Sequence, residues 1–181
     1  MRSSDGRLPV GRLTHVDEHG KAAMVDVTGK PVTFRVAEAR CVVRTSADTA
    51  AVLADPTVGA DLIESARFSG ILAAKRTSSL IPLCHPIPVE GMTVDIEVAP
   101  DGFSVRAVAS VSERTGVEME ALTACAVAGL VLLQPLLRPD PRASVEDLTL
   151  WHKSGGRSGT WQRPHGGPAG TDLGESNFGI R

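Results

Sequence analysis

Two short segments of the chain carry residue types that could together bind an anion and move protons. The segments read GILAAKRTSSLIPLCHP, which contains Lys75 and His85, and TGVEMEALTA, which contains Glu118 and Glu120. The second segment opens what the apolar spacing predicts to be a long helix. A cation, an imidazole and two carboxylates are the groups needed to grip an anionic substrate and to transfer protons on it. The sequence therefore predicts an active or binding site made of these two segments.

The two glutamates differ in how well a structural role would explain them. Thr115 and Glu118 fit a capping box, in which the threonine caps the helix and the glutamate reaches back to it. Glu120 lies about 200° further round the helix, so the cap does not explain it. The helix dipole favours acids in a first turn, however. A functional and a structural role therefore both remain open for Glu120.

The Cys84-His85 pair lies between Pro82 and Pro86, which stiffen its backbone. The pair could be a buried core pair, or His85 could be a positioned proton donor, because imidazole titrates near neutral pH. A metal site is disfavoured, since adjacent residues rarely both reach one ion and no partner cluster is visible.

Two basic segments have equally open interpretations. Lys75-Arg76 alone is typical of a solvated C-terminal helical turn. The loop KSGGRSG, which starts at Lys153, could turn backbone N–H groups and positive charge towards a phosphate. It does not match the P-loop pattern, and it could equally be a flexible exit from a strand.

The composition limits the classes of protein. The chain has 181 residues, enough for one domain, with 42% hydrophobic residues, four Phe, two Trp, no Tyr and a net charge of −2. Few aromatics and no basic field argue against nucleic-acid or membrane partners. Three cysteines without a CxxC pair, no apolar leader and no apolar run long enough to span a bilayer predict a cytoplasmic protein.

The apolar patterning predicts an α+β fold, with helices packed on one face of an antiparallel sheet. Alternating residues over 92–98 and 103–111 flank a Pro-Asp-Gly turn, which predicts a hairpin. We expect further strands over 37–45 and 148–151, and helices over 47–53, 60–80 and 115–133. The folded body is predicted over 13–163, between a disordered arm (1–12) and a disordered Gly/Pro-rich tail (164–181).

Four segments, in this order, resemble the cyclic pyranopterin monophosphate synthase (MoaC) family of molybdenum cofactor biosynthesis. They are LTHVDEHGKAAMVDVTGKPVT, GILAAKRTSSLIPLCHP, TGVEMEALTA and KSGGRSG, and the resemblance covers nearly all of residues 13–160. It implies a ferredoxin-like α+β fold in a homo-oligomer, either a dimer or a hexamer assembled from dimers, with sites at subunit interfaces. It also implies a lyase that converts 3′,8-cyclo-7,8-dihydro-GTP to cyclic pyranopterin monophosphate and pyrophosphate. The resemblance implies no cofactor beyond Mg²⁺ arriving with the triphosphate.

The resemblance also assigns roles to individual residues. The catalytic groups that it implies are Lys75, His85, Glu118 and Glu120. The substrate-binding groups that it implies are Asp26, Arg35, Leu83, Cys84, His85, Met119, Glu120 and Lys153.

The chain departs from the family at three polar positions. Gln134 stands where the family has its catalytic Asp, Leu137 stands at an essential lysine, and residues 57–61 lack the lysine that precedes a Gly-Asp. Gln134 can form hydrogen bonds but cannot carry the proton. Arg138 could replace the missing charge only if the helix shifts, and Pro135 is expected to end or kink that helix.

Three functions therefore remain open from the sequence. The chain could be a synthase with an altered site. It could be a diverged enzyme of the same fold that acts on a related purine nucleotide or pterin-like compound. It could also be a non-catalytic subunit that binds ligand or assembles with an active homologue.

Overall fold

The computed structural model describes residues 15–17, 19–53 and 55–164, without the side chains of 56–58. The arm expected over 1–12 lies outside the described residues, as does the expected tail apart from Pro164.

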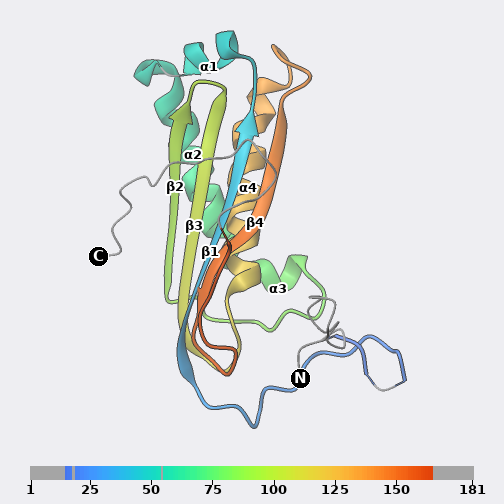
Figure 1. Ribbon diagram of the computed structural model, residues 1–181. Helices are drawn as coiled ribbons and strands as arrows, with labels where there is room; N and C mark the ends of the chain where they lie inside the picture. Colours follow the sequence, from blue (N-terminus) through green and yellow to red (C-terminus); the bar gives the residue numbers. More distant parts are fainter. Residues whose placement is uncertain (1–14, 18, 54, 165–181) are drawn as a thin grey trace.

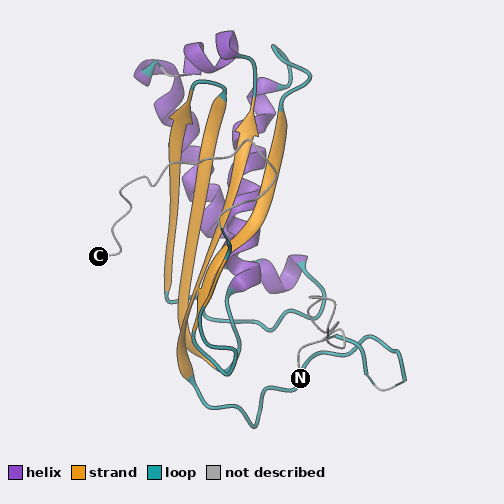
Figure 2. Ribbon diagram, viewed as in Figure 1, coloured by secondary structure: helices purple, strands orange, loops and turns teal. Residues whose placement is uncertain are grey.

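The strands form one antiparallel sheet in the order β2-β3-β1-β4-β5, and α2 and α4 cover one of its faces (Figures 1 and 2). The β1-α2-β2-β3-α4-β4 succession is a ferredoxin-like α+β fold, which confirms the predicted class. The elements are β1 (Thr33–Arg44), α1 (Ala47–Leu53), α2 (Pro56–Ala74), α3 (Thr77–Leu80), β2 (Gly91–Ala99), β3 (Gly102–Glu113), α4 (Glu118–Leu136), β4 (Ser144–Ser154) and β5 (Trp161–Gln162).

The hairpin between β2 and β3 is confirmed, with Ala99 paired to Gly102 across its turn. The short helix predicted over 47–53 is also present, as α1. The strand predicted over 148–151 is longer in the structure, where β4 extends over Ser144–Ser154. The end of β4 pairs with the short strand β5. In that pairing His152 lies opposite Gln162 and Lys153 lies opposite Trp161.

The predicted helix over 60–80 is interrupted. α2 ends at Ala74, a turn follows in which Arg76 N donates to Ala73 O at 2.9 Å, and α3 is one short turn. The buried Thr77 hydroxyl donates to Ala74 O at 3.0 Å. Side-chain hydroxyls that bond to the preceding turn compete with the regular helix pattern, which gives this break a local cause.

Small residues let α2 and α4 approach closely. A Cβ added to Gly70 of α2 would lie 2.9 Å from Ala124 O and 3.3 Å from Ala128 Cβ on α4. Beneath α4, the inward side chains of β1 and β3 are alanine, cysteine and valine, and Phe103 is the largest fully buried side chain. The core is therefore aliphatic and tightly layered, as the scarcity of aromatics predicts.

The prediction that no apolar run is long enough to span a bilayer was wrong for α4, which is long and apolar enough by length and composition alone. This helix packs against α2 and against β1, β3 and β4, and much of its surface is buried in the domain. The apolar composition of α4 is accounted for by its place as the core helix.

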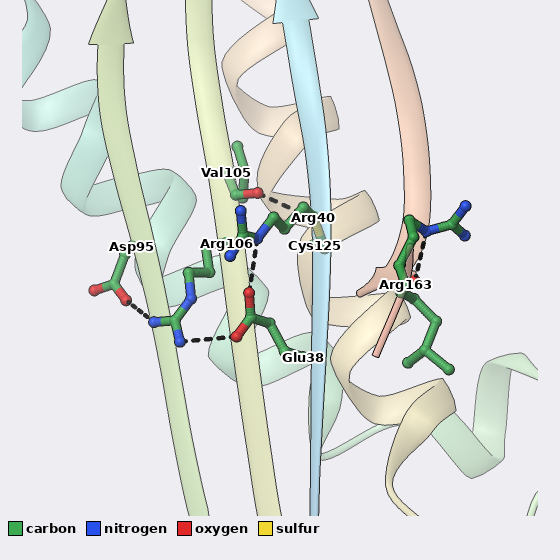
Figure 3. A network of polar contacts seen from close by, with 8 residues as sticks. Glu38, Arg40, Asp95, Val105, Arg106, Cys125 and Arg163 are labelled. Carbon is green, nitrogen blue, oxygen red and sulfur yellow. Dashed lines mark hydrogen bonds and ion pairs between the residues drawn. The ribbon is translucent and has the colours of Figure 1, made fainter. Parts of the chain in front are cut away.

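The face of the sheet opposite the helices carries a charged network (Figure 3). Glu38 accepts from Arg40 Nε at 2.7 Å and from Arg106 Nη2 at 2.9 Å, and Arg106 also contacts Asp95 at 3.3 Å. Burial opposes ionisation of Glu38, but the two guanidinium groups outweigh it and lower the pKa of this carboxyl. Arg40 also stacks over Trp151 at 4.3 Å.

Candidate active site

A cavity of about 480 Å³ lies where the first turn of α4 meets the segment that follows α3. It brings together the Leu83–His85 segment, the Glu118–Glu120 segment, Arg35 from β1 and Lys153 from β4. These residues come from four separate parts of the chain. The fold therefore joins the two segments that the sequence singled out, and adds a cation from each of two strands.

Glu118 does not form the predicted capping box. α4 begins at Glu118 itself, its N-cap is Val117, and no side chain caps the helix. The Glu118 carboxylate instead accepts from Lys153 Nζ at 3.3 Å and folds against Gly116, where a Cβ would overlap it. The glutamate is thus an ion-pair partner inside the cavity, and the capping prediction was wrong because a tertiary partner competes with the cap.

Glu120 is the buried acid of the cavity, with 3% of its surface exposed. Burial, and to a lesser extent the charge of Glu118, raises the pKa of Glu120 to about 7. A carboxyl that titrates near neutral pH can both give and take a proton under working conditions. The geometry therefore favours the functional alternative for Glu120 over the purely structural one.

Leu83, Cys84 and His85 reach the cavity through a strained turn. Leu83 has a φ of 67°, in the left-handed region that L-residues rarely adopt, and Cys84 N donates to Ile81 O at 3.3 Å. Burial, followed by the negative charge of Glu120, raises the pKa of the Cys84 thiol. Cys84 is therefore held as a thiol, and the imidazole of His85 lines the cavity beside it.

Arg35 is held at the rim of the cavity by main-chain acceptors at the end of β3. Its Nε donates to Glu113 O at 2.8 Å and its Nη2 donates to Arg114 O at 3.1 Å. A guanidinium has five N–H groups, so donors remain on Arg35 for a ligand.

The cavity is also lined by three basic side chains that were not predicted from the sequence, those of His15, Lys30 and Arg114. His15 and Lys30 lie in the segment LTHVDEHGKAAMVDVTGKPVT, and Arg114 directly precedes Thr115-Gly116. Their nearness to a recognised segment was the one available signal. Together with Arg35 and Lys153 they make the rim of the cavity suitable for a polyanion.

Three predicted site residues lie elsewhere. Lys75 is exposed in the turn after α2 and does not line the cavity. Asp26 accepts from the backbone N and the hydroxyl of Thr28, which lower the pKa of its carboxyl, so it serves a local turn. Gln134 lies fourteen residues beyond Glu120, about 21 Å along α4 at 1.5 Å per residue.

Gln134 lines a second cavity, of about 340 Å³, at the other end of α4. Its other lining residues are aliphatic: Val127, Leu130, Val131, Leu133 and Leu137. Pro135 does not end the helix before this point, since α4 continues to Leu136. Among the described residues, no group of three or more His, Cys, Asp or Glu side chains could hold a metal ion.

Fold and cavity together define a ferredoxin-like α+β protein with a cavity that contains a buried acid, Glu120, and cationic side chains at its rim. The chain belongs to the MoaC family, whose model matches residues 24–156. It is 46% identical over 154 residues to cyclic pyranopterin monophosphate synthase 2 of Mycobacterium tuberculosis, covering 84% of this chain and 92% of that protein. It is 44% identical over 162 residues to cyclic pyranopterin monophosphate synthase of Streptomyces coelicolor, covering 89% and 95%. The corresponding protein of a Nocardioides species is 47% identical over 157 residues, covering 84% and 96%.

Proposed function

We propose that this chain is a cyclic pyranopterin monophosphate synthase of molybdenum cofactor biosynthesis. It converts 3′,8-cyclo-7,8-dihydro-GTP into cyclic pyranopterin monophosphate and releases pyrophosphate. The observation that carries the proposal is the 480 Å³ cavity, in which a buried acid with a pKa near 7 lies among cations suited to a triphosphate. Family membership and relatives of that name at 44–47% identity support it.

The residues divide the work between charge and proton transfer. Arg35 and Lys153, with Lys30 and Arg114 nearby, bind the phosphates and stabilise the charge on leaving pyrophosphate. Glu120 and His85 exchange protons with the rings as they open and close. These steps are proton transfers and phosphate chemistry. In this proposal Mg²⁺ enters with the triphosphate, as part of the substrate.

A homo-oligomer in the cytoplasm is part of the proposal. Glu120 and Gln134 are about 21 Å apart along one helix. A site that used both family positions would therefore have to combine two copies of the chain. Exposed apolar side chains at the distal end of α4, such as Leu130 and Leu137, are consistent with such a contact.

A second candidate function is a diverged enzyme of the same fold that acts on a related purine nucleotide or pterin-like compound. The observation that favours it is the substitution at the distal end of α4. There, Gln134 and Leu137 replace the acid and the lysine that the resemblance implies, and the cavity around them is aliphatic. A non-catalytic binding or assembly subunit would share this feature but would give no turnover of any substrate.

The deciding experiment incubates the purified protein with enzymatically made 3′,8-cyclo-7,8-dihydro-GTP and follows pyrophosphate and pterin product by mass spectrometry. Turnover supports the synthase. Ligand binding without turnover rejects it and favours the diverged enzyme or the binding subunit.

The Gln134→Asp, Leu137→Lys double variant then separates two causes of inactivity. Recovery of turnover means that only those groups were missing. Continued inactivity of a folded double variant that still binds ligand means that the chemistry has changed.

A further inference from the structure

Arg35 lies against a part of the β4–β5 loop whose backbone conformation favours glycine. Gly155 and Gly156 have φ angles of 92° and 68°, in the left-handed region. A Cβ at Gly156 would overlap Arg35 Nη1 and lie 3.0 Å from Nη2. The side chain missing at Gly156 is therefore the space that the guanidinium occupies.

The opposite side of the same guanidinium is fixed by β3. The carbonyls of Glu113 and Arg114 accept from Nε and Nη2. Arg35 is thus clamped between two carbonyls and a glycine backbone at the rim of a cavity that also contains Lys153 and Arg114. An arginine held in this way has already lost its side-chain freedom, so binding a ligand does not have to order it.

We propose that Gly156 is a positioning residue for polyphosphate recognition, because it lets Arg35 adopt and keep its orientation at the cavity rim. The inference rests on the proposed function, since it takes the ligand of that cavity to be a polyphosphate. It assigns Gly156 no contact with substrate: Gly156 acts through Arg35. This role gives the glycine at position 156 a specific reason, because any larger residue there would meet the Arg35 guanidinium.

The test compares two alanine variants of the same loop. Gly156→Ala adds both left-handed backbone strain and a clash with Arg35. Gly159→Ala adds similar strain, because its φ is 65°, but a Cβ there would meet nothing within 4 Å. The second variant is therefore a matched control for the effect of the backbone alone.

Inorganic triphosphate is the probe, titrated calorimetrically into each folded variant at constant ionic strength. We expect Gly156→Ala to weaken binding by roughly 10-fold or more, the loss typical of a misplaced charge-assisted hydrogen bond, and Gly159→Ala to change it by less than about 2-fold. Equal losses in the two variants, or no loss in Gly156→Ala, would overturn the proposal.

The Arg35→Ala background supplies the readout that a merely structural glycine would not give. Without the guanidinium, the Gly156→Ala change has nothing to displace, so the double variant should bind triphosphate as weakly as Arg35→Ala alone. Additive losses would mean that Gly156 acts independently of Arg35. Should Gly156→Ala alone fail to fold, recovery of folding in the Arg35→Ala background supports the same contact, and its absence rejects it.

Failure of the proposed function is distinguishable from failure of this inference. Triphosphate binding requires no turnover, so an inactive parent that binds the probe still allows the comparison. A parent that does not bind triphosphate overturns the inference directly.

Discussion

At its N-terminal end, α4 presents Glu118 and Glu120 to a cavity that also holds Arg35 and Lys153, whereas at its C-terminal end it presents Gln134 and Leu137 to aliphatic side chains. The polar end is enclosed by strand termini and by the segment after α3, and it buries a titratable acid. The distal end is open and has no acid or lysine in its lining. The difference teaches that the two ends of one helix offer different chemistry, with acids and cations at the first and an amide among aliphatic side chains at the second.

The largest expected effect concerns turnover. His85→Ala and Glu120→Gln should each lower kcat for 3′,8-cyclo-7,8-dihydro-GTP by roughly 10²–10⁴-fold, the usual contribution of a general acid or base, while Gln134→Ala should change it by less than about threefold. Product formation under substrate saturation measures all three. A loss in Gln134→Ala as large as that in Glu120→Gln would break the contrast, and would mean that the two ends of α4 meet between copies.

The second effect is on stability as a function of pH. The pKa of Glu120 rises from 4.5 in the unfolded chain to about 7 in the folded one, so the folded state favours the protonated form. The contribution of Glu120 to the free energy of unfolding is therefore fully present below about pH 4.5 and is lost as the pH rises through 7. The loss is on the order of 3 kcal/mol.

Urea unfolding at pH 5 and pH 8 measures this loss. Glu120→Gln should remove most of the difference between the two conditions, whereas Glu97→Gln, at an exposed position on β2, should keep it. A slope that survives in Glu120→Gln would assign the pH dependence to another group.

A third, smaller effect concerns anion affinity at the cavity rim. Lys153→Met removes a cation that pairs with Glu118, and should weaken inorganic triphosphate binding by roughly 10-fold. Arg157→Met is the control, since Arg157 is an exposed cation of the same loop that does not line the cavity. Equal losses would indicate general electrostatic attraction and not a defined rim.

The smallest effect belongs to the distal end. Gln134 and Leu137 are exposed, so Gln134→Asp and Leu137→Lys should each change the free energy of unfolding by less than about 0.5 kcal/mol. Chemical denaturation at low protein concentration measures this change. A large destabilisation that disappears on dilution would show that this end of α4 is covered by a second copy.

Much of the fold could be predicted because it follows from local patterns. The β2–β3 hairpin was read from alternation around Pro-Asp-Gly, and the α+β class from interspersed periods of two and 3.6 residues. The break at Lys75-Arg76 was missed because the helical spacing continues across it. What ends α2 is a turn supported by Thr77, and no periodicity reports such a hydrogen bond.

The site was predicted in part, for a similar reason. The segments around His85 and Glu120 carry their chemistry in adjacent letters, so motif reading found them. Lys75 lies outside the cavity, because it follows the end of α2 in an exposed turn, and its role stays a prediction. Glu118 pairs with Lys153, thirty-five residues away, whereas the capping rule considers only local partners.

The pairing of β5 with β4 has a practical consequence for spectroscopy. The chain has two tryptophans and no tyrosine, and one of the two, Trp161, lies opposite Lys153 at the end of the loop that contains Gly156. Replacing Trp151 by Phe would leave a single fluorophore beside the cavity, partly open to water. The emission wavelength of Trp161 would then report any change in the surroundings of that loop when a ligand binds, without any added label.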